Sequence, residues 1–183
     1  NRDLGREDLE KLHFSGKDVL CGIAASGRTP YVLGAIAYAK SLGAATISVT
    51  CCPGSEVDTS ADIGISPSPG PEVVTGSTRL KSGTAQKMVL NMLSTATMIK
   101  LGKVYGNLMV DVRASNEKLV ERCVRIVRTA TGADTAAACV ALEQCNYSAK
   151  TAILMILRGI DAPAAEARLA QTQGRIAEAL RIN

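Results

Sequence analysis

The apolar positions in the first third of the chain predict strands that are buried on both faces. The run DVLCGIAAS covers residues 18–26 with little alternation, and the run AATISVTC, at residues 44–51, predicts a second buried strand. Such runs are typical of strands in a parallel sheet that is covered on both sides. The shorter run DIGIS, at residues 62–66, predicts a third strand of the same sheet.

Helical spacing of apolar residues separates these predicted strands. A short helix is predicted at residues 6–12, a second from Pro30 to Gly43, and a long one at about residues 84–101. Proline near the first turn and glycine after the last turn are the expected boundaries of the second helix. The loop PGSEVDTSA has room for one helical turn. Strand and helix alternate, which favours an α/β fold with a mostly parallel sheet.

The pattern changes after Asn107, where NLMVDVRASNEKL is predicted to be a connector. From Glu117 onward only helical periodicity is present, interrupted at Gly132 and Gly159, and Pro163 begins the last predicted helix. Three or four helices fit this stretch as a small bundle. We therefore expect residues 1–115 to form the α/β domain and residues 116–183 a helical domain.

Composition narrows the function classes. The chain has 183 residues, 46% of them hydrophobic and 21% charged, as in globular proteins. A net charge of +4 without a basic stripe disfavours nucleic acid as a partner. No apolar run approaches the ~20 residues that span a bilayer, and no signal peptide is visible, so we expect no membrane partner.

The cysteines and the single histidine do not predict a metal site. The chain has six cysteines, none of them in a C-x-x-C pair, and its one histidine is His13. Most of the cysteines lie in apolar patterns, which predicts small buried side chains in a reducing cytoplasm. The pair Cys51–Cys52 follows a predicted strand, where a reactive thiol is the less favoured alternative to packing. We expect neither a metal nor a cofactor.

The sequence IAASGRT places Ser26, Gly27 and Thr29 between a buried strand and the helix that begins near Pro30. In open α/β sheets this edge is where ligands bind. Hydroxyl and backbone N–H groups in such a turn can surround a phosphate, but the turn has neither the phosphate-loop nor the dinucleotide-binding pattern of glycines. A small phosphate ester is therefore favoured over a nucleotide. The alternative is that Ser26 and Thr29 only cap the helix.

A second polar turn, GPEVVTGSTRLKSGTAQK, covers residues 70–87 and precedes the long helix. Free N–H groups and the helix dipole favour an anion at a helix N-terminus, although a solvated loop with a good cap explains the same pattern. Glu72 could hold sugar hydroxyls or pair with Arg79 or Lys81, and Ser77 adds a hydroxyl. Two hydroxyl-rich turns in one sheet are stronger evidence for a ligand-binding site than a single turn would be.

These motifs resemble a known family. The second turn, together with GIAASGRTPYV, LNMLSTATMIKLGKVYGNLMVDV and SNEKL, is similar to the family that joins bacterial N-acetylmuramic acid 6-phosphate etherase and the animal glucokinase regulatory protein. The similarity covers about residues 1–180. It implies a sugar isomerase (SIS) domain, a flavodoxin-like sandwich that binds phosphosugars, which here lacks its first strand.

The resemblance implies roles for particular residues. Ser26, Gly27 and Thr29 match the phosphate-binding loop of SIS domains, and Glu72 and Ser77 match an element that reaches the sugar. Three further residues match a set that contacts phosphosugar in the regulatory protein: Asn116, Lys118 and Arg122. The alternative for Asn116 is a helix cap, and for the two cations a solvated face, although cations in a first helical turn oppose the dipole.

The implied activity of the whole protein is a carbon–oxygen lyase that removes D-lactate from C3 of the open-chain sugar phosphate. Two glutamates are expected to act as base and acid, and both match segments upstream of Asn1. The polar start without Met suggests a cut within a longer protein. Glu56 and Glu72 lie near predicted loop edges, but neither is expected to be a catalyst. We therefore expect this chain alone to be inactive.

Three functions remain open from the sequence. The first is the C-terminal part of a cytoplasmic, homodimeric etherase that recycles cell-wall sugar and binds a phosphorylated amino sugar. The second is a non-catalytic phosphosugar sensor like the regulatory protein, although that protein carries two SIS domains and this chain ends soon after one. The third is a helical interaction module attached to an inactive domain.

Overall fold

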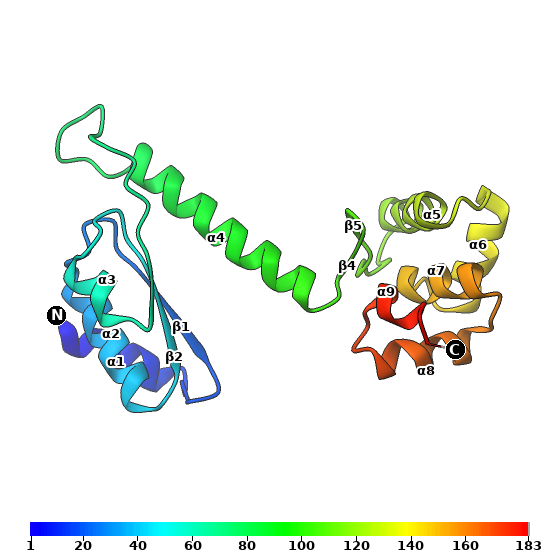
Figure 1. Cartoon of the computed structure of the whole chain (residues 1–183), viewed down its shortest axis with the longest axis horizontal. Coiled ribbons are helices and arrows are strands. Elements are labelled where there is room, and N and C mark those ends of the chain that lie inside the picture. The colour runs from blue at the N-terminus through cyan, green and yellow to red at the C-terminus, as the bar shows by residue number, and fades with distance from the viewer. Residues whose placement is uncertain (183) are drawn as a thin grey trace. The chain divides into compact units, whose positions relative to one another are not determined.

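The computed structural model describes residues 1–182 and divides into two compact units, residues 1–93 and 94–183 (Figure 1). The division falls within the long helix α4 (Lys81–Lys100). The sequence predicts a domain boundary near residue 115, and that boundary stays a prediction.

The first unit is built on a parallel sheet of three strands, β1 (Val19–Ile23), β2 (Ala45–Val49) and β3 (Ile63–Ile65), in that order. In the register of the sheet Cys21 lies beside Ile47, and Ile47 beside Ile63. The three strands lie within the three predicted runs. Because all of them are parallel, their carboxyl ends meet at one edge, as the α/β prediction requires.

Three helices, α1 (Arg2–Lys11), α2 (Pro30–Ser41) and α3 (Glu56–Ser60), lie on one side of this sheet (Figure 1). The buried side chains of α2 explain its position. A Cβ added to Gly22 of β1 would lie 2.8 Å from Cγ1 of Val32, so α2 packs directly on the backbone of β1. This close packing fixes the turn between β1 and α2.

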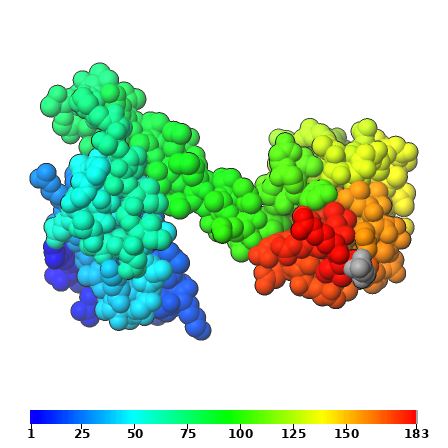
Figure 2. Space-filling view, in the orientation of Figure 1, coloured from blue at the N-terminus to red at the C-terminus, as the bar shows by residue number. Residues whose placement is uncertain are grey.

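Helix α4 begins three residues earlier than the sequence predicts. Its first turns are attached to the carboxyl end of β2, because Nε2 of Gln86 donates to the carbonyl of Val49 at 3.1 Å. Residues 66–80 before it have neither helix nor strand, and Figure 2 shows this segment at the surface of the first unit. The polar turn of residues 70–87 is therefore half loop and half helix.

The second unit contains a small hairpin and the helical bundle. The predicted connector partly forms the hairpin β4 (Val104–Tyr105) and β5 (Leu108–Met109), which is antiparallel. The predicted last helix is wrong in one respect, because Gln173 and Gly174 have positive φ and divide it in two. The helices are α5 (Glu117–Thr131), α6 (Thr135–Gln144), α7 (Ala149–Arg158), α8 (Ala162–Gln171) and α9 (Ile176–Ala179).

The core of this bundle is aliphatic. Leu142, Ile153 and Leu154 are fully buried at its centre, together with Cys123. Cys145 is also buried, and Cys52 is exposed, so burial holds for some of the cysteines only. Side chains cap several of the helices, which fixes where each begins. Asn116, Asp134, Ser148 and Asp161 are the capping residues.

Candidate functional site

The turn after β1 is closed tightly around Gly27. The N–H of Gly27 donates to the carbonyl of Ala24 at 3.0 Å, and the carbonyl of Gly27 accepts from the N–H of Val57 at 3.0 Å. Gly27 has φ of +65°, and a Cβ there would lie 2.0 Å from Oγ of Ser55. Conformation and contact both require glycine at this position. The turn is thus held against the start of α3.

The hydroxyls of this turn are not used as helix caps. Thr29 is the N-cap residue of α2, but its side chain makes no capping hydrogen bond. Ser26 is exposed, Thr29 is half-buried, and no hydrogen bond of either hydroxyl is found in the part of the chain that the structure describes. The capping alternative is therefore wrong for Thr29. Both hydroxyls are free to donate to a ligand at the carboxyl edge of the sheet.

Ser55 is a candidate that the sequence did not predict. Its Oγ is buried beside Gly27 and has no hydrogen-bond partner, although buried hydroxyls are usually paired. Ser55 precedes α3 as an N-cap residue without using its side chain. In the sequence Ser55 stands at an ordinary N-cap position. Only its close contact with Gly27, in the turn after β1, identifies it as a candidate. The hydroxyl adds a donor next to Gly27.

Glu72 fills the N-terminus of α4. Its carboxylate accepts from the backbone N–H groups of Lys81 and Ser82, each at 3.0 Å. These bonds, first that of Ser82 and then that of Lys81, lower the pKa of the Glu72 carboxyl below its usual value. The ammonium of Lys81 donates instead to the carbonyl of Pro71 at 2.8 Å. The predicted anion at this helix start is therefore the protein's own carboxylate.

The two polar turns are connected through Cys51. The N–H of Cys51 donates to the carbonyl of Ala25 at 2.9 Å, and its Sγ lies 3.7 Å from the carbonyl of Ser82. The β1 turn, the end of β2 and the start of α4 thus follow one another along the edge. Ser77 is half-buried in a turn closed by its N–H on the carbonyl of Val74. Among the described residues no hydrogen bond joins Ser77 to the β1 turn.

The three predicted residues of the helical part lie together on α5. Asn116 caps the helix by accepting from the N–H of Leu119 at 3.0 Å, which confirms the cap interpretation. Asn116, Lys118 and Arg122 also line one hollow of about 490 Å³. Arg125, three residues after Arg122, lines it too and was not predicted, although i, i+3 spacing places it on the same face.

Among residues 1–182 no three His, Cys, Asp or Glu side chains come together as a metal site would need. Within the same residues, every helix is too short or too polar to span a bilayer.

The first unit is similar to a known domain family. Residues 8–96 match the family model of the SIS domain. The parallel sheet and its helices agree with that match. The candidate phosphate turn and the start of α4 both lie inside the matched residues.

Comparison with curated proteins extends the similarity to nearly the whole chain. It is 59% identical over 180 residues to an N-acetylmuramic acid 6-phosphate etherase of Aliivibrio fischeri, a match that covers 98% of this chain and 60% of the relative. Etherase 1 of Vibrio cholerae is 57% identical with the same coverage, and the etherase of Cronobacter sakazakii is 54% identical, with 61% of it covered. The chain thus spans about 60% of the length of these relatives.

Proposed function

We propose that this chain belongs to the SIS-domain family of the N-acetylmuramic acid 6-phosphate etherases and is part of a carbon–oxygen lyase of cell-wall sugar metabolism. The reaction is the cleavage of the D-lactyl ether to give N-acetylglucosamine 6-phosphate and D-lactate. One observation carries the proposal, the 59% identity to a named etherase over 98% of the chain. The relatives reported above share that name, which favours the lyase over a regulatory protein.

In this proposal the reaction proceeds by elimination and rehydration. A base removes the C2 proton, which the C1 aldehyde of the open-chain sugar makes acidic. An acid protonates the ether oxygen as the C3–O bond breaks, and D-lactate leaves. Water then adds at C3. Positioned carboxyl groups are suited to both proton transfers.

The first unit contributes the anchor for the 6-phosphate. Ser26 and Thr29 offer free hydroxyls, Gly27 lets the backbone approach, and Ser77 adds a donor from the second turn. The unpartnered Oγ of Ser55 lies beside Gly27 and extends this set. Binding energy from a remote phosphate holds the reacting carbons in place, although the phosphate does not react.

Glu72 acts indirectly in this proposal. Because its carboxylate accepts two N–H groups of α4, it holds the second polar turn rather than moving a proton. The phosphosugar is also proposed to contact three residues of the second unit that line one hollow, Asn116, Lys118 and Arg122. The two cations among them would attract the negative charge of the phosphate. The protein is further proposed to act in the cytoplasm as a homodimer, as the family resemblance implies.

The test is release of D-lactate from N-acetylmuramic acid 6-phosphate by the intact protein purified from its source. Release that depends on Ser26 and Thr29 supports the proposal. The control is Ser41→Ala at the other end of α2, which is expected to retain activity. Binding of the phosphosugar without any release by the intact protein contradicts the lyase and favours the sensor.

A further inference from the structure

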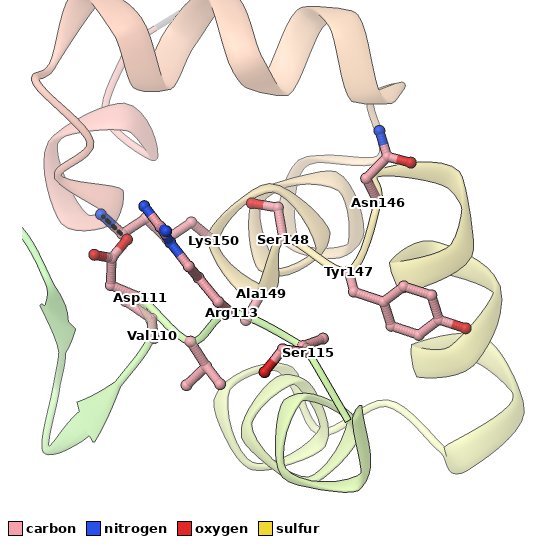
Figure 3. Close-up of a pocket in the computed structure, with 11 residues that line it drawn as sticks. Val110, Asp111, Arg113, Ser115, Asn146, Tyr147, Ser148, Ala149 and Lys150 are labelled. Carbon is pink, nitrogen blue, oxygen red and sulfur yellow. Dashed lines mark ion pairs between the residues drawn. The ribbon is translucent and has the colours of Figure 1, made fainter. Parts of the chain in front are cut away.

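The second unit contains a hollow that the proposed sugar site does not use. It has a volume of about 380 Å³ and lies between the extended residues 110–115 and the start of α7 (Figure 3). Val112 and Ala114 turn inward and pack on the helical core, and Val110 is fully buried. The intervening side chains Asp111, Arg113 and Ser115 are exposed. The wall of the hollow therefore alternates between core contacts and outward polar groups.

Cations outnumber anions at this hollow. The ammonium of Lys103 lies 2.5 Å from a carboxylate oxygen of Asp111, and that of Lys150 lies 3.5 Å from the other oxygen. Arg113 also lines the hollow, together with Lys150 and Asp111 (Figure 3). Two ammonium groups thus share the carboxylate of Asp111. The bond from Lys103, with the two lysine charges, lowers the pKa of Asp111, so the carboxylate is ionised at neutral pH.

Lys150 and Arg113 are the two cations of the hollow that lack a close carboxylate partner of their own. The side chain of Lys150 is only 15% exposed, and Asp111 is shared with the closer Lys103. A largely buried ammonium that is weakly paired is costly, because it has lost much of its hydration. No ion pair or side-chain hydrogen bond of Arg113 is found among the described residues. Its five N–H donors are available at the mouth of the hollow.

We propose that this hollow binds a small oxyanion, a carboxylate or a phosphate, held by the guanidinium of Arg113 and the ammonium of Lys150. Arginine holds both kinds of group through two parallel N–H bonds, and a nearby ammonium adds charge. Asp111 keeps Lys150 in position, and Lys103 keeps Asp111 in position. Ser115 adds a hydroxyl to the lining. The site is distinct from the hollow on α5 and does not depend on the proposed lyase activity.

The test uses ¹H–¹⁵N spectra of the intact protein titrated with sodium phosphate and, separately, sodium acetate, at constant ionic strength set with chloride. The expected result is saturable shifts of the amides at residues 110–115 and 146–150. Shifts at residues 24–29 report the proposed sugar-phosphate turn instead, so the two proposals are separated in one spectrum. The dissociation constants from the phosphate titration and from the acetate titration show which oxyanion the hollow binds more tightly.

Arg113→Gln is expected to weaken binding at residues 110–115 about tenfold or more, because a charged hydrogen bond is lost. Arg113→Lys keeps the charge without the fork and is expected to lie between wild type and Arg113→Gln. The matched control is Arg128→Gln, an exposed arginine in the last turn of α5, which should bind as wild type does. If Arg113→Gln does not fold, the wild-type titration still decides.

Two results overturn the proposal. The first is an absence of saturable shifts at residues 110–115 and 146–150 with either anion. The second is equal binding by wild type and Arg113→Gln, which would assign the shifts to general screening of charge.

Discussion

The carboxylate of Glu72 accepts the backbone N–H of Ser82 at 3.0 Å, and this bond connects the loop of residues 66–80 to the first turn of α4. The same carboxylate accepts from Lys81. A carboxylate at this position satisfies donors that the helix cannot, and its charge is favourable at the positive end of the dipole.

The bond predicts a dependence of stability on pH. The pKa of Glu72 is lowered in the folded protein, so its stabilising effect is present above the ordinary value of 4.5 and is lost as the pH falls through the folded pKa. Thermal unfolding of wild type and Glu72→Gln, measured from pH 7 down to pH 3, should show a difference that shrinks below about pH 4.5. A difference that stays constant over this range contradicts the assignment.

Gly27→Ala is expected to destabilise the fold more than Gly43→Ala. Both glycines have positive φ, +65° and +75°, where alanine costs about 1–2 kcal/mol. An added Cβ meets nothing within 4 Å at Gly43, but at Gly27 it would lie 2.0 Å from Oγ of Ser55. Urea denaturation of the two variants measures the difference, which isolates the steric contact. Equal losses would show that the turn can move away from α3.

Ser26→Ala and Thr29→Ala are expected to weaken phosphosugar binding by about 1–3 kcal/mol each, the cost of leaving a charged acceptor without one donor. Ser55→Ala should have a smaller effect of the same sign, because its Oγ lies deeper, beside Gly27. Calorimetric titration of the intact protein measures the three variants against Ser41→Ala. If Ser26→Ala and Thr29→Ala both bind as wild type does, the phosphate site lies elsewhere.

Lys118→Met and Arg122→Gln are expected to reduce phosphosugar affinity about tenfold each, since a charged hydrogen bond is worth that much. Both side chains are exposed on α5, so melting temperatures should change little. Arg125→Gln, on the same hollow, tests whether the site extends along the helix. A crystal structure with phosphosugar bound far from all three side chains would contradict the proposed contact.

The sequence predicts where the strands lie, but burial on both faces holds only for most of β2. Val19 and Ile23 of β1 and Ile63 of β3 are exposed, so that expectation is wrong for these two strands. Val49, with no exposed surface, is the last residue of β2. The break in the last helix was not predicted, since Thr172 and Gln173 fit a helical pattern and only the positive φ of Gln173 and Gly174 shows the turn. Local propensity does not contain the tertiary packing that decides such a break.

Local sequence patterns indicate some residues of the candidate site but not those whose role depends on tertiary contacts. Turn residues such as Gly27 are visible in sequence because glycine and hydroxyls cluster there. Ser55 was not visible, because its importance depends on a contact with Gly27, twenty-eight positions earlier in the chain. The role of Glu72 as a cap was also missed, since the helix start that it satisfies lies nine residues away.

A polypeptide of residues 1–183 tested alone is expected to release no D-lactate. Two carboxylates, Glu56 and Glu72, lie near the predicted loop edges of the sheet, and both have hydrogen-bond partners in the structure. Glu56 is paired with Arg2 at 2.5 Å, and Glu72 accepts two N–H groups and has a lowered pKa. With its lowered pKa Glu72 is a poor proton donor, and its two accepted N–H bonds make it a poor base.

The assay incubates the purified polypeptide with N-acetylmuramic acid 6-phosphate and measures D-lactate against the intact protein. Losing a positioned acid or base typically costs 10²–10⁴-fold, so the expected rate lies at least that far below the intact protein's. The double variant Glu56→Gln, Glu72→Gln serves as the control. Release by the wild-type polypeptide near the intact rate, abolished in the double variant, would assign the chemistry to these two residues and contradict the structural roles given to them here.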